Sequence, residues 1–381
     1  MSNEISTNKL VNKSVNKSGR FSLRKQIRTL YITGILGNLS LTGAWVVILA
    51  ARGFSLVQIG FAETVFHITS LICEIPSGML ADIYGRKKML VLGNLMAITG
   101  DLVMFFSQDY ALVLLSMPFH AMAFNFASGS GEALAYDSMK LENAQSGYEN
   151  YVSNQSIIYR IASGISTLAA GLALYLGYRK SYLISALMGC ITLFFTLKLF
   201  EIKGSEPQKE KSLFKGMVIF FADSIRFLYN NSKAAKLMFL NSFVGAVDIL
   251  LLFFLQSKLK TAGISNWLLG PALFVMELGG IVGARLILKA KKVRYVSVFT
   301  VCTAGVLAGV LLEHTSVIWL MVLGGFISAM ADDAIQIRTD AKLQDMFPSE
   351  QRATLISISS FTFSVIMIVL SPLAGYFFSI W

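Results

Sequence analysis

The sequence predicts an all-α membrane protein built from two bundles of helices. Of its 381 residues, 55% are hydrophobic and only 14% are charged, whereas soluble domains carry roughly 25% charged residues. The apolar residues form eleven segments spread along the chain. Each is long enough to cross a hydrocarbon layer about 30 Å thick as a helix. A multi-spanning helical protein follows from these two observations.

The predicted spans fall into two groups. The connection from Glu201 to Lys215 is long, polar and charged, and it divides the chain into six spans and five. We therefore expect a basic tail (1–28), a six-helix bundle (29–200), a central loop (201–233) and a five-helix bundle (234–381). The expected spans are 29–50, 56–80, 89–107, 110–131, 153–176, 181–200, 234–255, 266–288, 295–312, 316–337 and 354–378.

The net charge of +11 indicates orientation and not a nucleic-acid partner, because the basic residues do not gather on one soluble face. They lie in the amino-terminal tail and in alternate loops between spans. This is the positive-inside pattern of membrane proteins. It predicts a multi-pass protein of the plasma membrane with a cytoplasmic amino terminus.

The central loop contains a second kind of helix. Its apolar residues recur at helical spacing, with charged residues elsewhere on the wheel, which predicts an amphipathic helix on the inner membrane surface. A shallow, half-inserted helix is the alternative. The apolar positions are Phe214, Val218, Phe221, Ile225 and Leu228.

The stretch GMLADIYGRKK, Gly78–Lys88, forms the turn between the second and third spans. Glycine allows a close reversal of the chain, and Asp82 can accept hydrogen bonds from a neighbouring helix end or from Arg86. An ordinary cytoplasmic loop would explain the basic residues. It would not explain the spacing of Gly78, Asp82, Gly85 and Arg86.

That spacing, after the second of six spans and with a long central loop, resembles the signature loop of the major facilitator superfamily, and the resemblance covers the whole chain. It implies two helical bundles of the major facilitator type. It also implies that the loop is a conformational latch, which holds the two halves in one arrangement. The latch residues carry over to Gly78, Asp82, Gly85, Arg86 and Lys87.

Other stretches resemble the drug-efflux branch of that family, namely EIPSG (74–78), SGSGEALAYDS (128–138) and FPSEQRATLIS (347–357). Three features depart from it. The corresponding loop of the second half, Gly283 to Arg294, lacks the acidic residue, and Arg160 to Ala173 lacks the proline of the antiporter signature. The predicted spans number eleven where the family has twelve, so the twelfth helix is missing from the prediction.

Polar residues within the spans predict a cavity, because an ionisable group in a membrane usually faces a cavity or a partner. On the second span the polar residues fall within about 60° of arc. The first and fifth spans carry similar stripes, and the second half adds deep acids. The candidate cavity residues are Asn38, Thr42, Trp45, Glu63, His67, Glu74, Arg160, Asp248 and Glu277.

Each of these stripes has a second interpretation. Hydroxyl side chains such as Ser163 and Thr167 also hydrogen-bond neighbouring helices, and Glu74 with Arg160 also fits a fixed ion pair. His67 fits either a neutral hydrogen-bonded ring or one that titrates. Glu63 is then the preferred proton carrier, whereas we expect Asp332 and Asp333 to be solvated near the inner end of the tenth span.

No cofactor, metal site or enzymatic activity is expected. The sequence has no ATP-binding loop and no H-E-x-x-H, and its three histidines are scattered. The resemblance implies a monomeric secondary transporter that exports small amphipathic compounds, driven by protons. Two alternatives remain: a facilitator or importer without proton coupling, and a transporter-like sensor or accessory membrane protein.

Asp82→Asn is expected to abolish transport while membrane insertion and abundance stay near wild type, because the latch controls interconversion and not folding. Uptake or efflux of a labelled lipophilic cation in vesicles measures the first, and quantitative blotting of membranes measures the second. Full transport by Asp82→Asn would remove this aspartate from the latch.

Overall fold

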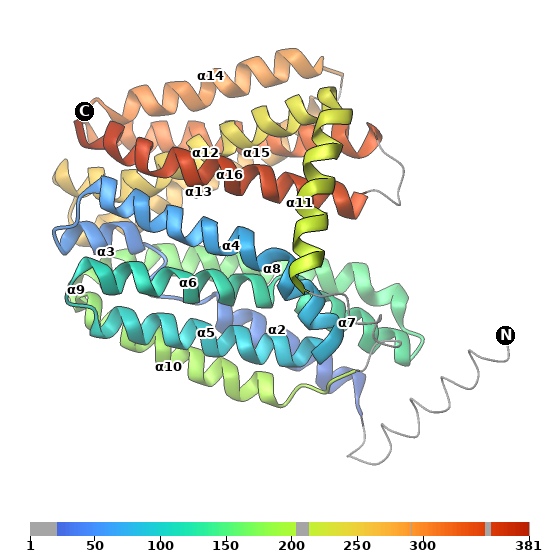
Figure 1. Cartoon of the computed structure of the whole chain (residues 1–381). Helices are drawn as coiled ribbons and strands as arrows, with labels where there is room; N and C mark the ends of the chain where they lie inside the picture. Colours follow the sequence, from blue (N-terminus) through green and yellow to red (C-terminus); the bar gives the residue numbers. More distant parts are fainter. Residues whose placement is uncertain (1–20, 203–212, 291, 347–351, 381) are drawn as a thin grey trace, which may run out of the picture.

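The computed structural model describes residues 21–202, 213–290, 292–346 and 352–380, and within these ranges every regular element is a helix. Figure 1 shows two groups of roughly parallel helices, one from each half of the chain. The first group contains α2 (Leu23–Asn38), α3 (Trp45–Ala51), α4 (Leu56–Tyr84), α5 (Arg86–Phe106), α6 (Tyr110–Ala127), α7 (Ser130–Leu141), the short η1 (Gln145–Gly147), α8 (Tyr148–Leu168), α9 (Ala170–Leu176) and α10 (Tyr178–Leu197).

The second group contains α12 (Ser232–Thr261), α13 (Asn266–Lys289), α14 (Tyr295–Glu313), α15 (Ile318–Met346) and α16 (Arg352–Ile380). Between the groups, α11 (Leu213–Asn230) lies across the ends of the other helices. In the described part of the chain, nine helical segments are long and apolar enough to cross a membrane. A tenth results if α8 and α9, which are bent by 45° relative to each other, count as one. The multi-spanning helical architecture is thereby confirmed.

The first predicted span, 29–50, is not one helix as expected. The chain leaves the α-helix after Asn38 and resumes it at Trp45. The Ser166 hydroxyl of α8 accepts a hydrogen bond from the Ser40 N–H (2.9 Å) and donates to the Asn38 carbonyl (3.2 Å). Irregular backbone at membrane depth needs such partners, and small polar residues offer the backbone alternatives to the helix.

The main contact between the two bundles lies toward one end of their roughly parallel helices. We call the side that carries the start of α2 and α11 the near side, and the opposite side the far side. One hydrophobic core on the far side draws on both bundles, including Leu49, Ile59, Leu250 and Leu269. On the near side, Leu134 and Tyr151 belong to a core of the first bundle, and separate clusters serve the second.

Glycines bring the backbones together at this far-side contact. A Cβ atom at Gly60 of α4 would overlap the Ser371 carbonyl oxygen of α16, and Gly375 meets Leu56 in the same way. The contact of the α8–α9 segment with α13 repeats this arrangement, because Gly171 of α9 meets the Asn266 carbonyl and Gly270 of α13 meets that of Leu168, the last residue of α8. We call these two contacts the glycine seams.

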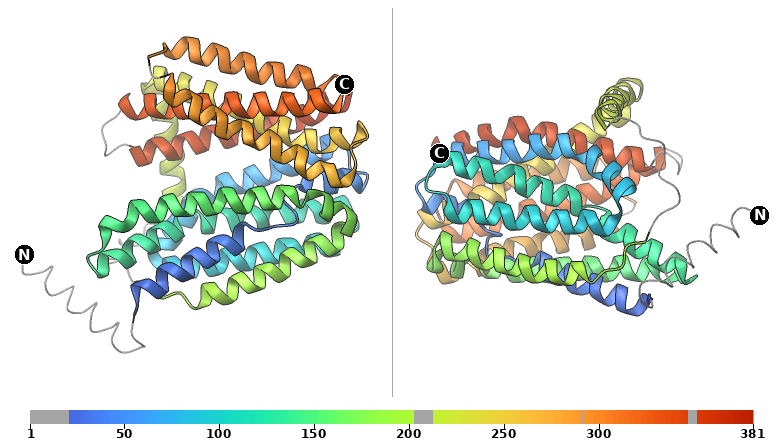
Figure 2. Two further views of the ribbon diagram at one scale, coloured as in Figure 1. Left: turned by 180° about the vertical axis from the view of Figure 1, so that it is seen from behind. Right: turned by 60° about the horizontal axis from the view of Figure 1, so that its bottom comes forward.

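Helix α11 matches the amphipathic helix expected in the central loop. Figure 2 shows from two further directions that it runs across the helix ends. Phe227 and Leu228 pack against a cluster that includes Ala234 and Met238, whereas Val218 and Ile225 are exposed. The side chains of Phe214 and Phe221 lie outside the described part. Attachment to the membrane surface stays a prediction.

Gly171→Ala is expected to weaken the second glycine seam and move the bundles toward a state that is closed on the near side. Gly131→Ala is the matched control, since a Cβ there would meet no atom within 4 Å. Spin labels at Lys140 and Ala341, both exposed near-side helix positions, report the distance between bundles by pulsed electron paramagnetic resonance. The background lacks the free cysteines Cys73, Cys190 and Cys302. An identical distance distribution in both variants would contradict the role of the seam.

Candidate functional site

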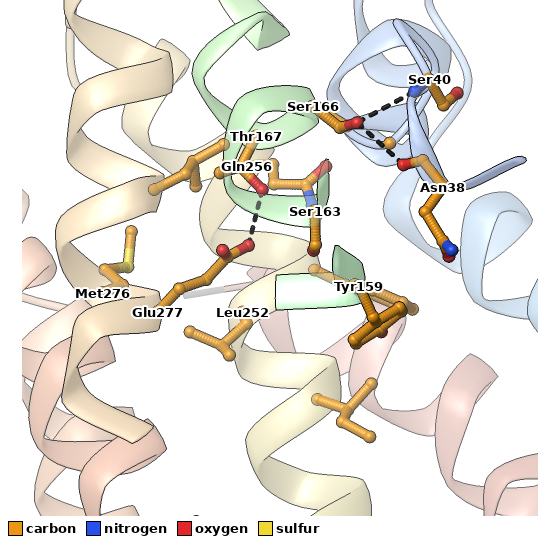
Figure 3. Close-up of a pocket in the computed structure, with 15 residues that line it drawn as sticks. Asn38, Ser40, Tyr159, Ser163, Ser166, Thr167, Leu252, Gln256, Met276 and Glu277 are labelled. Carbon is orange, nitrogen blue, oxygen red and sulfur yellow. Dashed lines mark hydrogen bonds between the residues drawn. The ribbon is translucent and has the colours of Figure 1, made fainter. Parts of the chain in front are cut away.

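A cavity of about 370 Å³ lies between the two bundles. It is lined by the break between α2 and α3, by α8, and by α12 and α13 of the other bundle (Figure 3). The glycine seams hold the bundles together on the far side. The cavity lies next to them, where side chains and not glycine backbones face each other across the two bundles. A concave site with a few convergent polar groups is the usual form of a small-molecule site.

The walls of this cavity differ in chemistry. The second bundle contributes an apolar wall that includes Leu252, Phe253 and Met276. The first bundle contributes amide and hydroxyl groups, including Asn38, Ser163 and Tyr159, and α12 adds Gln256. The cavity therefore suits a molecule that has both an apolar and a polar part.

Glu277 of α13 is the one formally charged group among the described residues that line the cavity. The Thr167 hydroxyl of α8 donates a hydrogen bond to its Oε1 atom at 2.6 Å, which joins the two bundles (Figure 3). No ion pair of Glu277 with a described basic residue is present. The cavity thus carries a negative group without a positive counterpart, which disfavours anionic ligands.

The structure separates the candidates of the first span. Asn38 lines the cavity, whereas the Thr42 hydroxyl lies 2.8 Å from that of Ser40 and 3.4 Å from that of Ser185 in α10. The shared face expected for Asn38 and Thr42 is therefore wrong, because the helix is broken between them. Trp45 packs its ring 5.8 Å from the ring of Phe253.

Glu63 and His67 lie inside the contact between α4 and α16. The His67 Nε2 atom is 3.3 Å from the Glu63 Oε1 atom, and the His67 ring is 5.8 Å from the Phe363 ring of α16. Both residues are buried, and the His67 Nδ1 atom has no hydrogen-bond partner. They form a buried pair at the contact between the bundles and are not on the cavity wall.

The alternative of a Glu74–Arg160 ion pair is wrong for this arrangement. No ion pair joins these two described side chains. Arg160 is exposed and instead acts electrostatically on Asp333 of α15, in the opposite bundle. The physical reason is that α8 borders the space between the bundles, so that Arg160 acts on the second bundle and does not pair with Glu74 of α4.

The expectation of a solvated Asp332 is also wrong. Asp332 is only 8% exposed and Asp248 only 4%. Both lie within the second bundle and not on the cavity wall. Asp333, one residue further, is half-buried. A span boundary read from hydropathy placed Asp332 too near the surface, because α15 continues to Met346.

The latch loop is held within the first bundle. The Glu201 carboxylate, after α10, accepts hydrogen bonds from the backbone N–H groups of Lys87 (3.2 Å) and Lys88 (3.1 Å) at the start of α5. Arg86 forms an ion pair with Asp137 of α7 at 3.2 Å. An anion at a helix N-terminus satisfies its unpaired N–H groups. Sequence reasoning missed the roles of Glu201 and Asp137, although Asp137 lies in a stretch quoted for the family resemblance.

Gly85 is required at this turn for two reasons. Its φ of 105° lies in a region that residues with a side chain rarely adopt, and a Cβ there would lie 2.5 Å from the Glu201 carboxyl carbon. Gly78 faces open space. Asp82 lies in α4 near its end, and its side chain is outside the described part, so its role in the latch stays a prediction.

The family follows from a comparison of the sequence with family models. The model described as Major Facilitator Superfamily matches residues 29–336. The chain belongs to this superfamily. An uncharacterized MFS-type transporter of Bacillus subtilis (strain 168), YxaM, is 22% identical to it over 324 residues, which are 83% of this chain and 79% of that protein. The chain is a transporter of this superfamily and not an enzyme.

Solved structures of similar fold support the assignment at the level of the fold. A mutant form of the nucleoside transporter NupG gives a TM-score of 0.74 at 16% identity, covering 92% of this chain and 91% of that one. A D-xylose-proton symporter gives 0.68 at 12% identity, with 91% and 88% covered. A bacterial homolog of the human lysosomal transporter Spinster, in an inward-facing and unoccupied conformation, gives 0.67 at 17%, with 93% and 82% covered.

Glu201→Ala is expected to destabilise the transporter by about 1 kcal/mol, the usual cost of losing a helix cap. Glu142→Ala is the matched control, because it removes the same charge from an exposed near-side position that is not at a helix N-terminus. Thermal unfolding of the purified proteins, followed by near-ultraviolet circular dichroism, measures the difference. Equal midpoints for the two variants would show that the Glu201 cap does not stabilise the latch loop.

Proposed function

We propose that this transporter exports small amphipathic compounds across the plasma membrane by alternating access, in exchange for protons. The observation that carries the proposal is the cavity between the bundles, which combines amide and hydroxyl groups, mainly from the first bundle, with an apolar wall and a single carboxylate from the second. Residues of both bundles line this cavity, and the glycine seams hold the two bundles together on the far side.

The distribution of basic residues places the near side in the cytoplasm. The basic groups Arg86, Lys87 and Lys88 lie at the near side, where α4 ends and α5 begins, and positive residues favour the cytoplasmic side. With the near side in the cytoplasm, the structure is an inward-facing state, sealed outside by the glycine seams. Rocking of the bundles about the cavity would then expose it to the outside.

Two features of the cavity lining support a cationic or neutral substrate. Glu277 has no basic partner among the described residues, so a positively charged group can approach its second oxygen. Tyr159 and Phe253 also line the cavity, and aromatic faces attract cations. A proton and a cationic substrate then compete for the same carboxylate, which is the physical basis of exchange.

Glu63 remains a second candidate for proton exchange. Its carboxylate and His67 are buried at the contact between α4 and α16, where separation of the bundles would change their exposure to water.

Uptake of a hydroxylated solute without proton coupling is the second candidate function. Hydroxyl and amide groups make up most of the polar wall, including Ser40, Ser163 and Gln256. Fold relatives include a nucleoside transporter. A D-xylose-proton symporter among them supports a hydroxylated solute but not the absence of proton coupling. A transporter-like sensor is the remaining alternative.

Transport by the full-length protein in liposomes tests these proposals. An imposed pH gradient is expected to drive movement of a fluorescent lipophilic cation. Glu277→Gln is expected to reduce that transport at least tenfold while keeping the hydrogen bond from Thr167, and Glu149→Gln serves as the control. A radiolabelled nucleoside and a sugar are the competing substrates.

Each outcome of this assay is decisive. Transport of the nucleoside or sugar that ignores the pH gradient, without transport of the cation, would replace export by the second candidate. Folded protein that moves none of the three probes would favour a sensor. Unchanged cation transport by Glu277→Gln would remove Glu277 from the substrate site.

A further inference from the structure

Two polar stripes face each other inside the second bundle, away from the cavity. On α12, the positions of Asn241, Gly245 and Asp248 are spaced i, i+4, i+7. On α15, Ser328, Asp332 and Gln336 are spaced i, i+4, i+8. Such spacings place each set on one face of its helix.

The stripes are in register. The Asn241 Nδ2 atom donates to the Gln336 Oε1 atom at 2.7 Å, and the Gln336 Nε2 atom donates to the Asp332 Oδ1 atom at 3.4 Å. Gly245 allows this approach, because a Cβ there would lie 2.5 Å from the Gln336 Nε2 atom. At the next step Asp248 meets Ser328 and interacts electrostatically with Asp332.

We call these two facing stripes, Asn241 to Asp248 on α12 and Ser328 to Gln336 on α15, the polar ladder. This ladder brings two carboxyl groups near each other at a depth where charge is costly. Asp248 and Asp332 occupy the middle of long apolar helices and are 4% and 8% exposed. Neither forms an ion pair with a basic residue in the described ranges. Two carboxylates that share such a site cannot both remain ionised without a compensating cation.

Buried atoms without a hydrogen-bond partner also indicate that one of the two carboxyl groups carries a proton. The Asp248 Oδ1 and Asn241 Oδ1 atoms are buried and have no hydrogen-bond partner within 3.5 Å, and both residues are more than nine-tenths buried. A buried polar atom without a partner is costly. A proton on one carboxyl group would supply a donor to the acceptors of this ladder.

The groups around the pair do not neutralise it. Asp333 acts on Asp248 from α15, and Cys302 of α14 lies beside Asp332. No titratable group of α3, α13 or α16 within the described residues acts on Asp248. Asp333 meets Gly280 of α13 and is acted on by Arg160 across the gap between bundles. It therefore connects the buried pair with the space between the bundles.

We propose that Asp248 and Asp332 form a proton-binding pair inside the second bundle, distinct from the substrate cavity, and that Asp333 connects it with the near side. One carboxyl group of the pair carries the proton while the other stays ionised. On release, the proton passes to water through Asp333. The pair is then left with two negative charges, whose mutual repulsion favours the binding of another proton. The described residues contain no His, Cys, Asp and Glu group suited to a metal ion. The role of the pair in coupling rests on the proposed function, whereas its protonation does not.

Infrared difference spectroscopy of the purified full-length transporter between acidic and alkaline buffers tests the protonation. The wild type is expected to show a carbonyl band of a buried carboxylic acid that shifts when aspartate carries carbon-13. Asp248→Asn and Asp332→Asn are each expected to lose it, and Asp340→Asn, an exposed position on the same helix, to keep it. If the Asn variants do not fold, the labelled wild type decides alone, because absence of the band would overturn the proposal.

Two further arms separate the alternatives. Thermal stability in sodium and in choline chloride at fixed pH is expected to be equal, and a stabilisation specific to sodium would overturn the proton in favour of a metal cation. In liposomes, Asp332→Asn is expected to retain exchange of the lipophilic cation in the absence of a pH gradient. The rate of gradient-driven transport is expected to fall at least tenfold. Gradient-driven transport equal to wild type would exclude a coupling role for the pair, even with the infrared band present.

Discussion

Every polar group at membrane depth must find a partner inside the protein, and this constraint governs the arrangement of the transporter. The Ser166 hydroxyl meets it at the break between α2 and α3, where it bonds Ser40 and Asn38. The break can therefore border the cavity without exposing its backbone to lipid. Thr167, the next residue, reaches across the cavity to Glu277. One turn of α8 thus supports the irregular backbone of its own bundle and bonds the opposite bundle.

The far-side contact and the cavity are mechanically connected through that turn. Leu168, which follows Thr167, presents its carbonyl to Gly270, and Gly171 lies on the next turn against Asn266. A ligand that competes for the Glu277 carboxylate would disturb the Thr167 hydrogen bond directly beside this seam. Backbone contact through glycine depends on close approach, so a small displacement there separates the helices. This proximity gives a physical route from occupancy of the cavity to movement of the bundles.

Three groups of acidic residues in the interior occupy different environments. Glu277 borders the cavity, Glu63 and His67 lie at the contact between bundles, and Asp248 with Asp332 lies inside the second bundle. Each environment responds differently to the conformational cycle. In the proposed cycle, the carboxylate at the cavity would respond to the ligand, the one between the bundles to their separation, and the buried pair to the access of water to the bundle interior.

The sequence by itself determined the class of the protein, the multi-spanning helices and the family, because apolar length and the spacing of Gly78, Asp82, Gly85 and Arg86 are local properties of the chain. Local pattern also identified Asn38 and Glu277 as polar positions within spans. Only the tertiary structure decided which neighbours these residues have. It broke the first span, turned Thr42 toward α10, placed Arg160 near Asp333 and buried Asp332 against α12. These outcomes depend on contacts between helices distant in sequence, and helical periodicity gives the face of a residue but not the helix that the face meets.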